Sequence, residues 1–231
     1  MKPTNKQLLE WFEYLWQSKA IYLWGANSEK ITKKLTDKLY SWFASKKYNK
    51  AYYDNKLKEG EGKIGADCSG SFYPISGFDT TADGYYHKCK EKGSIVKTPR
   101  QKVCQVFHRS LTGDITHIGL YCGNGYTIEM KSSKDNCVKQ KFNPLRWTYY
   151  GIPDWITREN PFVEPDETIQ LGSKGVGVKW VQWELREAGY KLDIDGKCGK
   201  ITEKYIKAYQ KLHNLEVDGR VGPATRAEMK K

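Results

Sequence analysis

The sequence predicts an α+β domain, in which helices pack on an antiparallel sheet, followed by a small all-α domain of three helices. Two observations lead to this division. Helical segments precede short strands up to about residue 157, and a D-G-x-x-G-x-x-T motif then occurs twice, at 195–202 and 218–225. The chain has 231 residues, 39% of them hydrophobic, so it can form two packed cores.

The N-terminal part predicts helices around a polar loop. Thr4 and Gln7 have the spacing of a capping box. Apolar residues then recur at helical intervals, which predicts a helix over 4–18: Leu8, Trp11, Phe12, Leu15 and Trp16. A second helix is predicted over 28–46, and the glycine-punctuated tract 49–66 is predicted to be a loop.

Residues 115–129 carry the clearest strand pattern. One face of the predicted strand has Ile115, His117, Gly119 and Tyr121, and the residues between them form the other face. The tract 123–125, Gly-Asn-Gly, predicts a hairpin turn, after which a strand restarts at 126–129. Residues 149–156 predict a last strand. The first domain is therefore assigned to 1–157.

The remainder divides into a linker and the helical domain. Residues 158–167 contain two prolines and several acids, which is typical of a linker, and the domain is assigned to 168–231. Helices are predicted at 176–190 and 202–215. The second is expected to bury one face, made of Tyr205, Ala208, Tyr209 and Leu212. Each D-G-x-x-G motif suits a tight turn, and we interpret both turns as holding the fold.

The formal net charge is +12, which predicts attraction to a polyanion. Residues 166–231 hold 13 Lys and Arg against 10 Asp and Glu, a net of +3, which leaves +9 on residues 1–165. Nucleic acid, an anionic membrane and a bacterial wall would all suit this charge. The aromatic residues follow core periodicity and the chain lacks a nucleic-acid recognition motif, so we expect no nucleic-acid partner.

The N-terminus does not read as a secretory signal, because Glu10, Glu13 and Gln17 interrupt its apolar residues. No apolar run reaches the length of a membrane span. We therefore expect synthesis in the cytoplasm without a signal peptide, no stable membrane insertion, and a monomer. No cysteine pair has C-x-x-C spacing, so we expect no metal or cofactor, and free thiols are favoured over disulfides. The six cysteines are Cys68, Cys89, Cys104, Cys122, Cys137 and Cys198.

The stretch 65–70, Gly-Ala-Asp-Cys-Ser-Gly, contains the cysteine with the most suggestive neighbours. Cys68 could be a filler, a disulfide half, a metal ligand or a nucleophile. A nucleophilic cysteine reacts as the thiolate, which a nearby cation or a helix N-terminus stabilises. Asp67 and Ser69-Gly70 predict a turn that could start a short helix and aim backbone N–H groups at the sulfur.

A nucleophilic cysteine also needs a histidine from elsewhere in the chain. We interpret His87 as solvated, His213 as a surface residue, and His108 as either structural or functional. His117 lies in the best strand, where an inward-facing polar side chain needs a partner. Glu129 on the returning strand is available, and Cys, His and a polar orienting group form the arrangement used in acyl transfer.

Four segments resemble the NlpC-type cell-wall cysteine peptidases in order and approximate spacing. They are YLWGAN at 22–27, DCSG at 67–70, THIGLYCGNG at 116–125 and TIEM at 127–130. The resemblance covers about residues 5–157 and implies a reduced papain-like fold. It implies Cys68 as nucleophile, His117 as base and Glu129 as the third polar residue. It also implies an oxyanion and substrate region formed by Tyr22, Trp24, Asp67 and Ser69.

Two features depart from this family. Its third polar residue is often a histidine, whereas this chain has Glu129; a carboxylate can also hold an imidazole tautomer. Family members usually continue into a long helix after the cysteine, whereas Pro74 and Gly77 would end such a helix early here.

The C-terminal part resembles the three-helix peptidoglycan-binding domain found beside many wall hydrolases. Together the two resemblances imply a peptidoglycan hydrolase, of the kind of a phage or prophage endolysin released to the wall through membrane lesions. By family analogy the bond cut joins γ-linked D-glutamate to the diamino acid. The alternatives are an N-acetylmuramoyl-L-alanine amidase on the same scaffold and a non-catalytic wall-binding protein.

Overall fold

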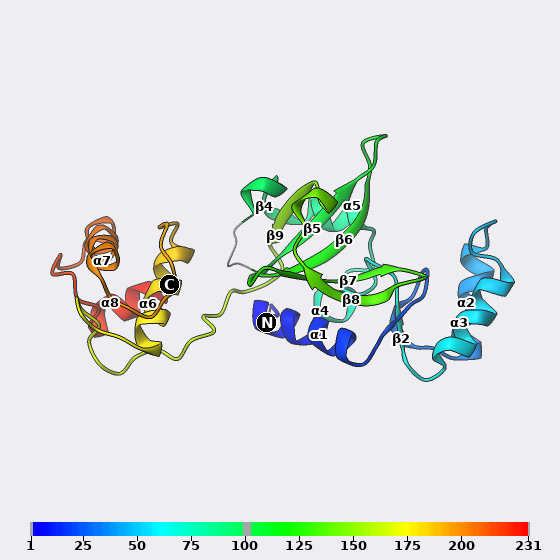
Figure 1. Ribbon diagram of the computed structural model, residues 1–231, viewed down its shortest axis with the longest axis horizontal. Coiled ribbons are helices and arrows are strands. Elements are labelled where there is room, and N and C mark those ends of the chain that lie inside the picture. The colour runs from blue at the N-terminus through cyan, green and yellow to red at the C-terminus, as the bar shows by residue number, and fades with distance from the viewer. Residues whose placement is uncertain (1, 99–102, 231) are drawn as a thin grey trace. The chain divides into compact units, whose positions relative to one another are not determined.

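The computed structural model describes residues 2–98 and 103–230. The chain forms two compact units, Met1–Arg158 and Glu159–Lys231 (Figure 1). All six cysteines are free thiols. Within the described ranges, no helix is both long and apolar enough to cross a membrane.

The first unit is built on a six-stranded sheet whose neighbouring strands are all antiparallel. The strand order is β4-β9-β5-β6-β7-β8. The bounds are β4 Cys89–Ser94, β5 Val103–Arg109, β6 Ile115–Cys122, β7 Tyr126–Ser132, β8 Asn136–Lys141 and β9 Tyr149–Pro153. The predicted hairpin is confirmed as β6 and β7. This unit is α+β, as the sequence predicts, with helices and an antiparallel sheet.

Three short strands form a second, smaller sheet that carries the approach to Cys68. They are β1 Ile21–Tyr22, β2 Asn27–Lys30 and β3 Ile64–Ala66. The central strand, β3, pairs with β1 in parallel and with β2 antiparallel. Cys68 follows β3 by two residues, so the small sheet fixes where the cysteine lies.

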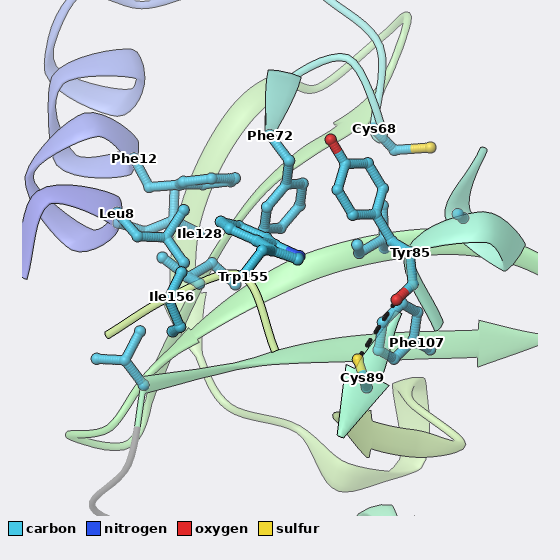
Figure 2. Packing of buried hydrophobic residues seen from close by; sticks show 14 of the residues in the cluster. Leu8, Phe12, Cys68, Phe72, Tyr85, Cys89, Phe107, Ile128, Trp155 and Ile156 are labelled. Atoms are coloured by element: carbon cyan, nitrogen blue, oxygen red, sulfur yellow. Dashed lines mark hydrogen bonds between the residues drawn. The ribbon is translucent and has the colours of Figure 1, made fainter. Parts of the chain in front are cut away.

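Helix α1, Asn5–Gln17, has the predicted capping box, in which Thr4 accepts from the Gln7 backbone and Gln7 accepts from that of Thr4. Its buried face contacts β6, β7 and β8. Leu8 and Phe12 lie against Ile128, Trp155 and Ile156 in the main core (Figure 2). Each large side chain buried in this way contributes about 1.5–3 kcal/mol.

The segment between β1 and β3 differs from the prediction. Residues 27–30 form strand β2, so the predicted helix over 28–46 shortens to α2, Lys33–Phe43, which Thr32 caps. The predicted loop over 49–66 is wrong, because it contains helix α3, Lys50–Gly60. Asn49 caps α3 by accepting from the Tyr52 backbone N–H, and Tyr53 is buried against α2 and the small sheet.

Short helices and turns complete the unit. They are α4 Tyr73–Ser76, α5 Ala82–His87, and the 3₁₀ turns η1 Ile95–Lys97 and η2 Pro144–Arg146. Helix α4 ends at Gly77, which has φ of 71°, so the early stop predicted from Pro74 and Gly77 is confirmed. Helix α5 ends at His87, and strand β4 begins at Cys89.

The second unit is helical, with α6 Val176–Glu187, α7 Lys200–Leu212 and α8 Pro223–Met229 around one core. The predicted buried face of α7 is partly wrong. Ile206 and Tyr209 are buried, whereas Ala208 is exposed and Leu212 is 71% exposed. The buried face of α7 consists of Thr202, Ile206, Tyr209 and Gln210.

Two buried glutamines hold the repeated turns with matching hydrogen bonds. The amide nitrogen of Gln182 donates to Asp195 at 2.8 Å and to the Lys197 carbonyl at 3.1 Å, and its oxygen accepts from the Gly196 N–H. Gln210 makes the same three bonds to Asp218, Arg220 and Gly219. These networks agree with the interpretation that the turns hold the fold.

Candidate active site

Cys68 lies in a turn that one buried carboxylate organises. Asp67 accepts from the backbone N–H groups of Gly25, Ser69 and Gly70 at 2.7–3.0 Å, and from the Ser69 hydroxyl at 3.0 Å. With four donors around it, the Asp67 side chain shapes the turn. Its predicted contact with substrate, and that of Ser69, stay predictions.

Gly70 explains why the turn needs a residue without a side chain. A Cβ at this position would come within 2.0 Å of the Ala26 carbonyl oxygen. Ser28 donates its hydroxyl to the Gly70 carbonyl at 3.0 Å, and Trp11 of α1 donates its indole N–H to the Ser71 carbonyl at 2.8 Å. The turn is therefore fixed to both the small sheet and α1.

The sulfur of Cys68 lies beside the strand that carries His117. The backbone N–H groups of Ile118, the residue after His117, and of Ser69 favour a negative charge on this sulfur. Figure 2 shows the sulfur pointing away from the rings of Phe72 and Tyr85. Chain topology thus brings the Cys68 sulfur to the backbone of Ile118, fifty positions away in the sequence.

Burial of the Cys68 sulfur opposes a thiolate in the resting protein. The Cys68 side chain is 6% exposed, and burial raises the pKa of its thiol to about 12, with the nearby Asp67 carboxylate acting in the same direction. The N–H groups that face the sulfur oppose this rise without overcoming it. Burial therefore favours the thiol form of Cys68, which needs a base to become nucleophilic.

His117 and Glu129 are directly bonded. Nε2 of His117 donates to Oε2 of Glu129 at 2.6 Å. The β6–β7 register pairs Leu120 with Ile128, so Gly119 lies opposite Glu129, and His117 lies two positions further along the same face. A Cβ at Gly119 would lie 2.7 Å from the Trp147 ring and 3.1 Å from the Glu129 Cβ. Glycine here leaves room for the histidine and carboxylate to meet.

Glu129 is completely buried and has two further partners. Arg146 binds it through two parallel bonds, Nε to Oε1 at 3.0 Å and an Nη to Oε2 at 2.6 Å, and Gln140 donates to Oε1 at 2.9 Å. Burial alone would raise the pKa of Glu129, but the bonds from His117 and Arg146 lower it below its ordinary value. Glu129 is therefore a carboxylate, and its lone pairs are aimed at named donors.

Arg146, Gln140 and Trp147 were not predicted from the sequence. The Trp147 ring stacks on the His117 ring, with centroids 5.7 Å apart and an angle of 17°. Arg146 and Trp147 are neighbours in the tract 144–147, Pro-Leu-Arg-Trp, whose only sequence signal is a basic and an aromatic residue just before the last strand. Arg146 reaches Glu129, and Trp147 reaches His117, through the order of the strands in the sheet, which the sequence does not reveal.

Tyr22 is buried, and its predicted part in the oxyanion region stays a prediction. Burial raises the pKa of the Tyr22 hydroxyl well above its ordinary value, and the Cys68 and Asp67 groups raise it further. The phenol therefore stays protonated and can donate. Trp24 stacks on Tyr48 at 4.6 Å and its backbone N–H donates to the Tyr52 hydroxyl; its contact with substrate stays a prediction.

The other histidines lie in different surroundings. His108 is exposed on β5, opposite His117, and contacts the Thr116 hydroxyl at 3.3 Å. His87 is exposed at the end of α5 and pairs with Asp83, and His213 pairs with Glu228. His117 is thus the histidine that has a buried carboxylate partner and precedes Ile118, whose backbone N–H faces the Cys68 sulfur.

Across residues 2–98 and 103–230, no group of three or more His, Cys, Asp or Glu side chains is placed to hold a metal ion. A cavity of about 590 Å³ is bordered by Trp16, Ile21, Glu59, Asn136 and Cys137, among others. None of the predicted site residues borders it.

Comparison with known proteins supports peptidoglycan binding by the second unit. Residues 174–229 match the family described as "Putative peptidoglycan binding domain". This range contains α6, α7, α8 and both glutamine-held turns. No curated protein matches the chain.

Among solved structures, the Burkholderia AP3 phage endolysin is similar at 38% identity and a TM-score of 0.27, over 27% of this chain and 24% of that one. The chain thus spans about a quarter of that endolysin's length. The SleB N-terminal domain is similar at 29% identity and a TM-score of 0.29, over 29% of this chain and 94% of that one. A Clostridioides difficile peptidoglycan-binding protein, in complex with glutamine hydroxamate, is similar at 20% identity and a TM-score of 0.28, over 52% and 65%. At these TM-scores none of the three defines the fold of this chain.

Proposed function

We propose that the protein is a peptidoglycan hydrolase in which a reduced papain-like cysteine peptidase domain cuts an amide bond of the stem peptide and the helical unit holds the wall. The observation that carries this proposal is the 2.6 Å bond between His117 and the buried Glu129, on the strand segment that faces the sulfur of Cys68. The match of residues 174–229 to a peptidoglycan-binding family supports the substrate class.

The first chemical step is proton transfer from the Cys68 thiol to His117. Because Nε2 of His117 donates to Glu129, Nδ1 is the nitrogen left to accept this proton. The sulfur then attacks the amide carbonyl and forms an S–C bond. The Tyr22 hydroxyl and the Cys68 backbone N–H donate to the resulting oxyanion.

The second half of the reaction releases both products. His117 returns its proton to the amine nitrogen, the C–N bond breaks, and a thioester joins the acyl part to Cys68. Water then loses a proton to His117 and attacks the thioester. The S–C bond breaks, the acid leaves, and His117 reprotonates the sulfur. The reaction begins and ends with Cys68 as a thiol, which agrees with the burial of its sulfur.

We assign the cut bond to the one between γ-linked D-glutamate and the diamino acid, and the setting to that of an endolysin acting on the wall after release. Mass spectrometry of digested purified walls tests the bond directly. A new amine on the diamino acid is expected. A new amine on L-alanine would assign the protein instead as an N-acetylmuramoyl-L-alanine amidase.

The nucleophile is tested by comparing Cys68→Ala with Cys137→Ala on the same walls. Cys137 is a partly buried thiol on β8 that the mechanism does not use. Loss of Cys68 is expected to abolish release of amines while the variant still sediments with walls, and Cys137→Ala is expected to cut at the native rate. Undiminished release of amines by Cys68→Ala would contradict the proposal: either the first unit is not catalytic, or another residue is the nucleophile.

A further inference from the structure

One short loop contacts both members of the His117–Glu129 pair. Asn143 accepts from the Leu145 backbone N–H and fixes the start of η2, which presents Arg146 and then Trp147. Arg146 binds the Glu129 carboxylate and Trp147 stacks on the His117 ring. The Arg146 guanidinium also lies 5.3 Å from the Trp147 ring centroid, so the two side chains support each other.

The charges of this cluster determine which form of His117 is stable. A lone buried carboxylate at 2.6 Å would favour imidazolium strongly. A bidentate arginine on the same carboxylate compensates its charge and uses both of its oxygens. Gln140 adds a hydrogen bond to Glu129 without adding charge. Because the Arg146 cation offsets the Glu129 anion, Glu129 accepts the His117 N–H while the two together carry little net charge.

We infer that Arg146 is a positioning residue: by compensating the buried Glu129 carboxylate it keeps the His117 imidazole uncharged, and with Trp147 it fixes the tautomer in which Nε2 donates to Glu129. This inference rests on the proposed function, because it explains how a buried thiol and a neutral base coexist before substrate binds.

Other titratable groups lie on the elements around the His117–Glu129 pair. Strand β5 contributes His108 opposite His117, and the turn after β3 contributes the Cys68 thiol and the buried Asp67. From β8, the thiol of Cys137 is close enough to Glu129 for that carboxylate to raise its pKa. Arg146 is the one among these neighbours that binds Glu129 with a permanent positive charge.

The test compares Arg146→Gln with wild type by NMR titration of the imidazole signals without substrate, the His117 signal being assigned from its loss in His117→Gln. Removing Arg146 is expected to raise the pH at which the His117–Glu129 pair takes up a proton by about one unit. Because hydrolysis needs the neutral base, the acid limb of the kcat/KM profile on soluble stem-peptide fragments should move upward by a similar amount. The rate near pH 6 then falls about tenfold more than the rate near pH 8.

Lys139→Gln is the matched control, because it removes one positive charge from β8 where Lys139 pairs with Glu13. It is expected to leave both the titration and the pH profile unchanged. If Arg146→Gln does not fold, Arg146→Lys carries the test: a single-point cation should give a smaller upward shift, about 0.3 unit. A native titration in the Arg146 variants, or an equal shift in Lys139→Gln, would overturn the inference.

The titration separates this inference from the hydrolase proposal. If the titration shifts as expected but wild type cuts no wall, Arg146 still tunes His117 and the proposed reaction is wrong. If wild type cuts walls while the Arg146 variants titrate and work like wild type, the reaction stands and the role of Arg146 is wrong.

Discussion

The two units of the chain each bury a polar network, and the networks are built differently. In the helical unit, Gln182 and Gln210 are neutral, are both about 1% exposed, and repeat the same bonds at two turns. In the sheet unit, Glu129 is charged and its network occurs once. A neutral hydrogen-bond network that is repeated is typical of a structural role, whereas a single charged network around a histidine is typical of a catalytic site.

The contrast extends to what each network holds. The glutamine networks tie backbone groups of a turn to a helix, so the side chains they fix are structural. The Glu129 network fixes a histidine ring: Glu129 bonds its Nε2, Trp147 stacks on it, and Arg146 binds the same carboxylate. A buried charge costs several kcal/mol to desolvate, so retaining one here fits a role in the reaction.

The largest expected effect comes from breaking the charged network. Glu129→Gln keeps the shape of the side chain but removes the charge that stabilises His117 when it is protonated. We expect hydrolysis of soluble fragments to fall by about 10³-fold or more. Glu13→Gln is the control, since Glu13 also pairs with a cation at 2.6 Å but lies on α1. If Glu129→Gln hydrolyses soluble fragments within tenfold of the wild-type rate, the network has a structural role and not a catalytic one.

A smaller, thermodynamic effect is expected from breaking either neutral network. Gln210→Ala leaves the Gly219 N–H and the turn carbonyl without their partner, and should lower the free energy of unfolding of the helical unit by about 2–3 kcal/mol. Gln182→Ala should cost a similar amount. Urea unfolding of the full chain measures both, with the exposed Gln170→Ala as control. Unequal costs, or a loss of hydrolysis of soluble fragments, would contradict the equivalence of the turns.

The smallest expected effect is that of salt on the lysis of whole walls, and it depends on the different net charges of the two units. Residues 1–165 hold +9 of the +12, so the sheet unit supplies most of the attraction to a polyanionic wall. Lysis of whole walls should slow severalfold between about 0.05 and 0.5 M salt, while hydrolysis of soluble fragments changes little. Lysis rates that stay flat over this range would show that long-range attraction to the wall is not used.

The parts of the fold that sequence predicted well are those with strong local signals. The β6–β7 hairpin has clear alternation and a Gly-Asn-Gly turn, and α1 has a complete capping box. The edge strands β4 and β8 are polar, Cys-Lys-Glu-Lys-Gly-Ser and Asn-Cys-Val-Lys-Gln-Lys, because charged residues suit a sheet edge; they carry no apolar pattern to recognise. Helix α3 was not predicted because its buried residues, Tyr53, Lys56 and Gly60, form no aliphatic pattern.

The site was predictable to a similar extent. Cys68, His117 and Glu129 have motif and spacing signals, and the structure pairs His117 with Glu129 as expected. Arg146 meets Glu129 only because β9, β5, β6 and β7 are neighbours, so its part depends on tertiary structure. The protonation of Cys68 was also beyond the sequence, since it depends on how completely the folded chain buries the sulfur.

The covalent intermediate is the most direct test of the central claim. Enzyme quenched in acid during steady-state cleavage of stem-peptide fragments, and then peptide-mapped by mass spectrometry, should carry an acyl adduct on the peptide that contains Cys68. His117→Gln should show no measurable cleavage and should carry no acyl adduct on Cys68. Rapid cleavage with an unmodified Cys68 throughout, and the same rate in Cys68→Ala, would contradict the thiol mechanism.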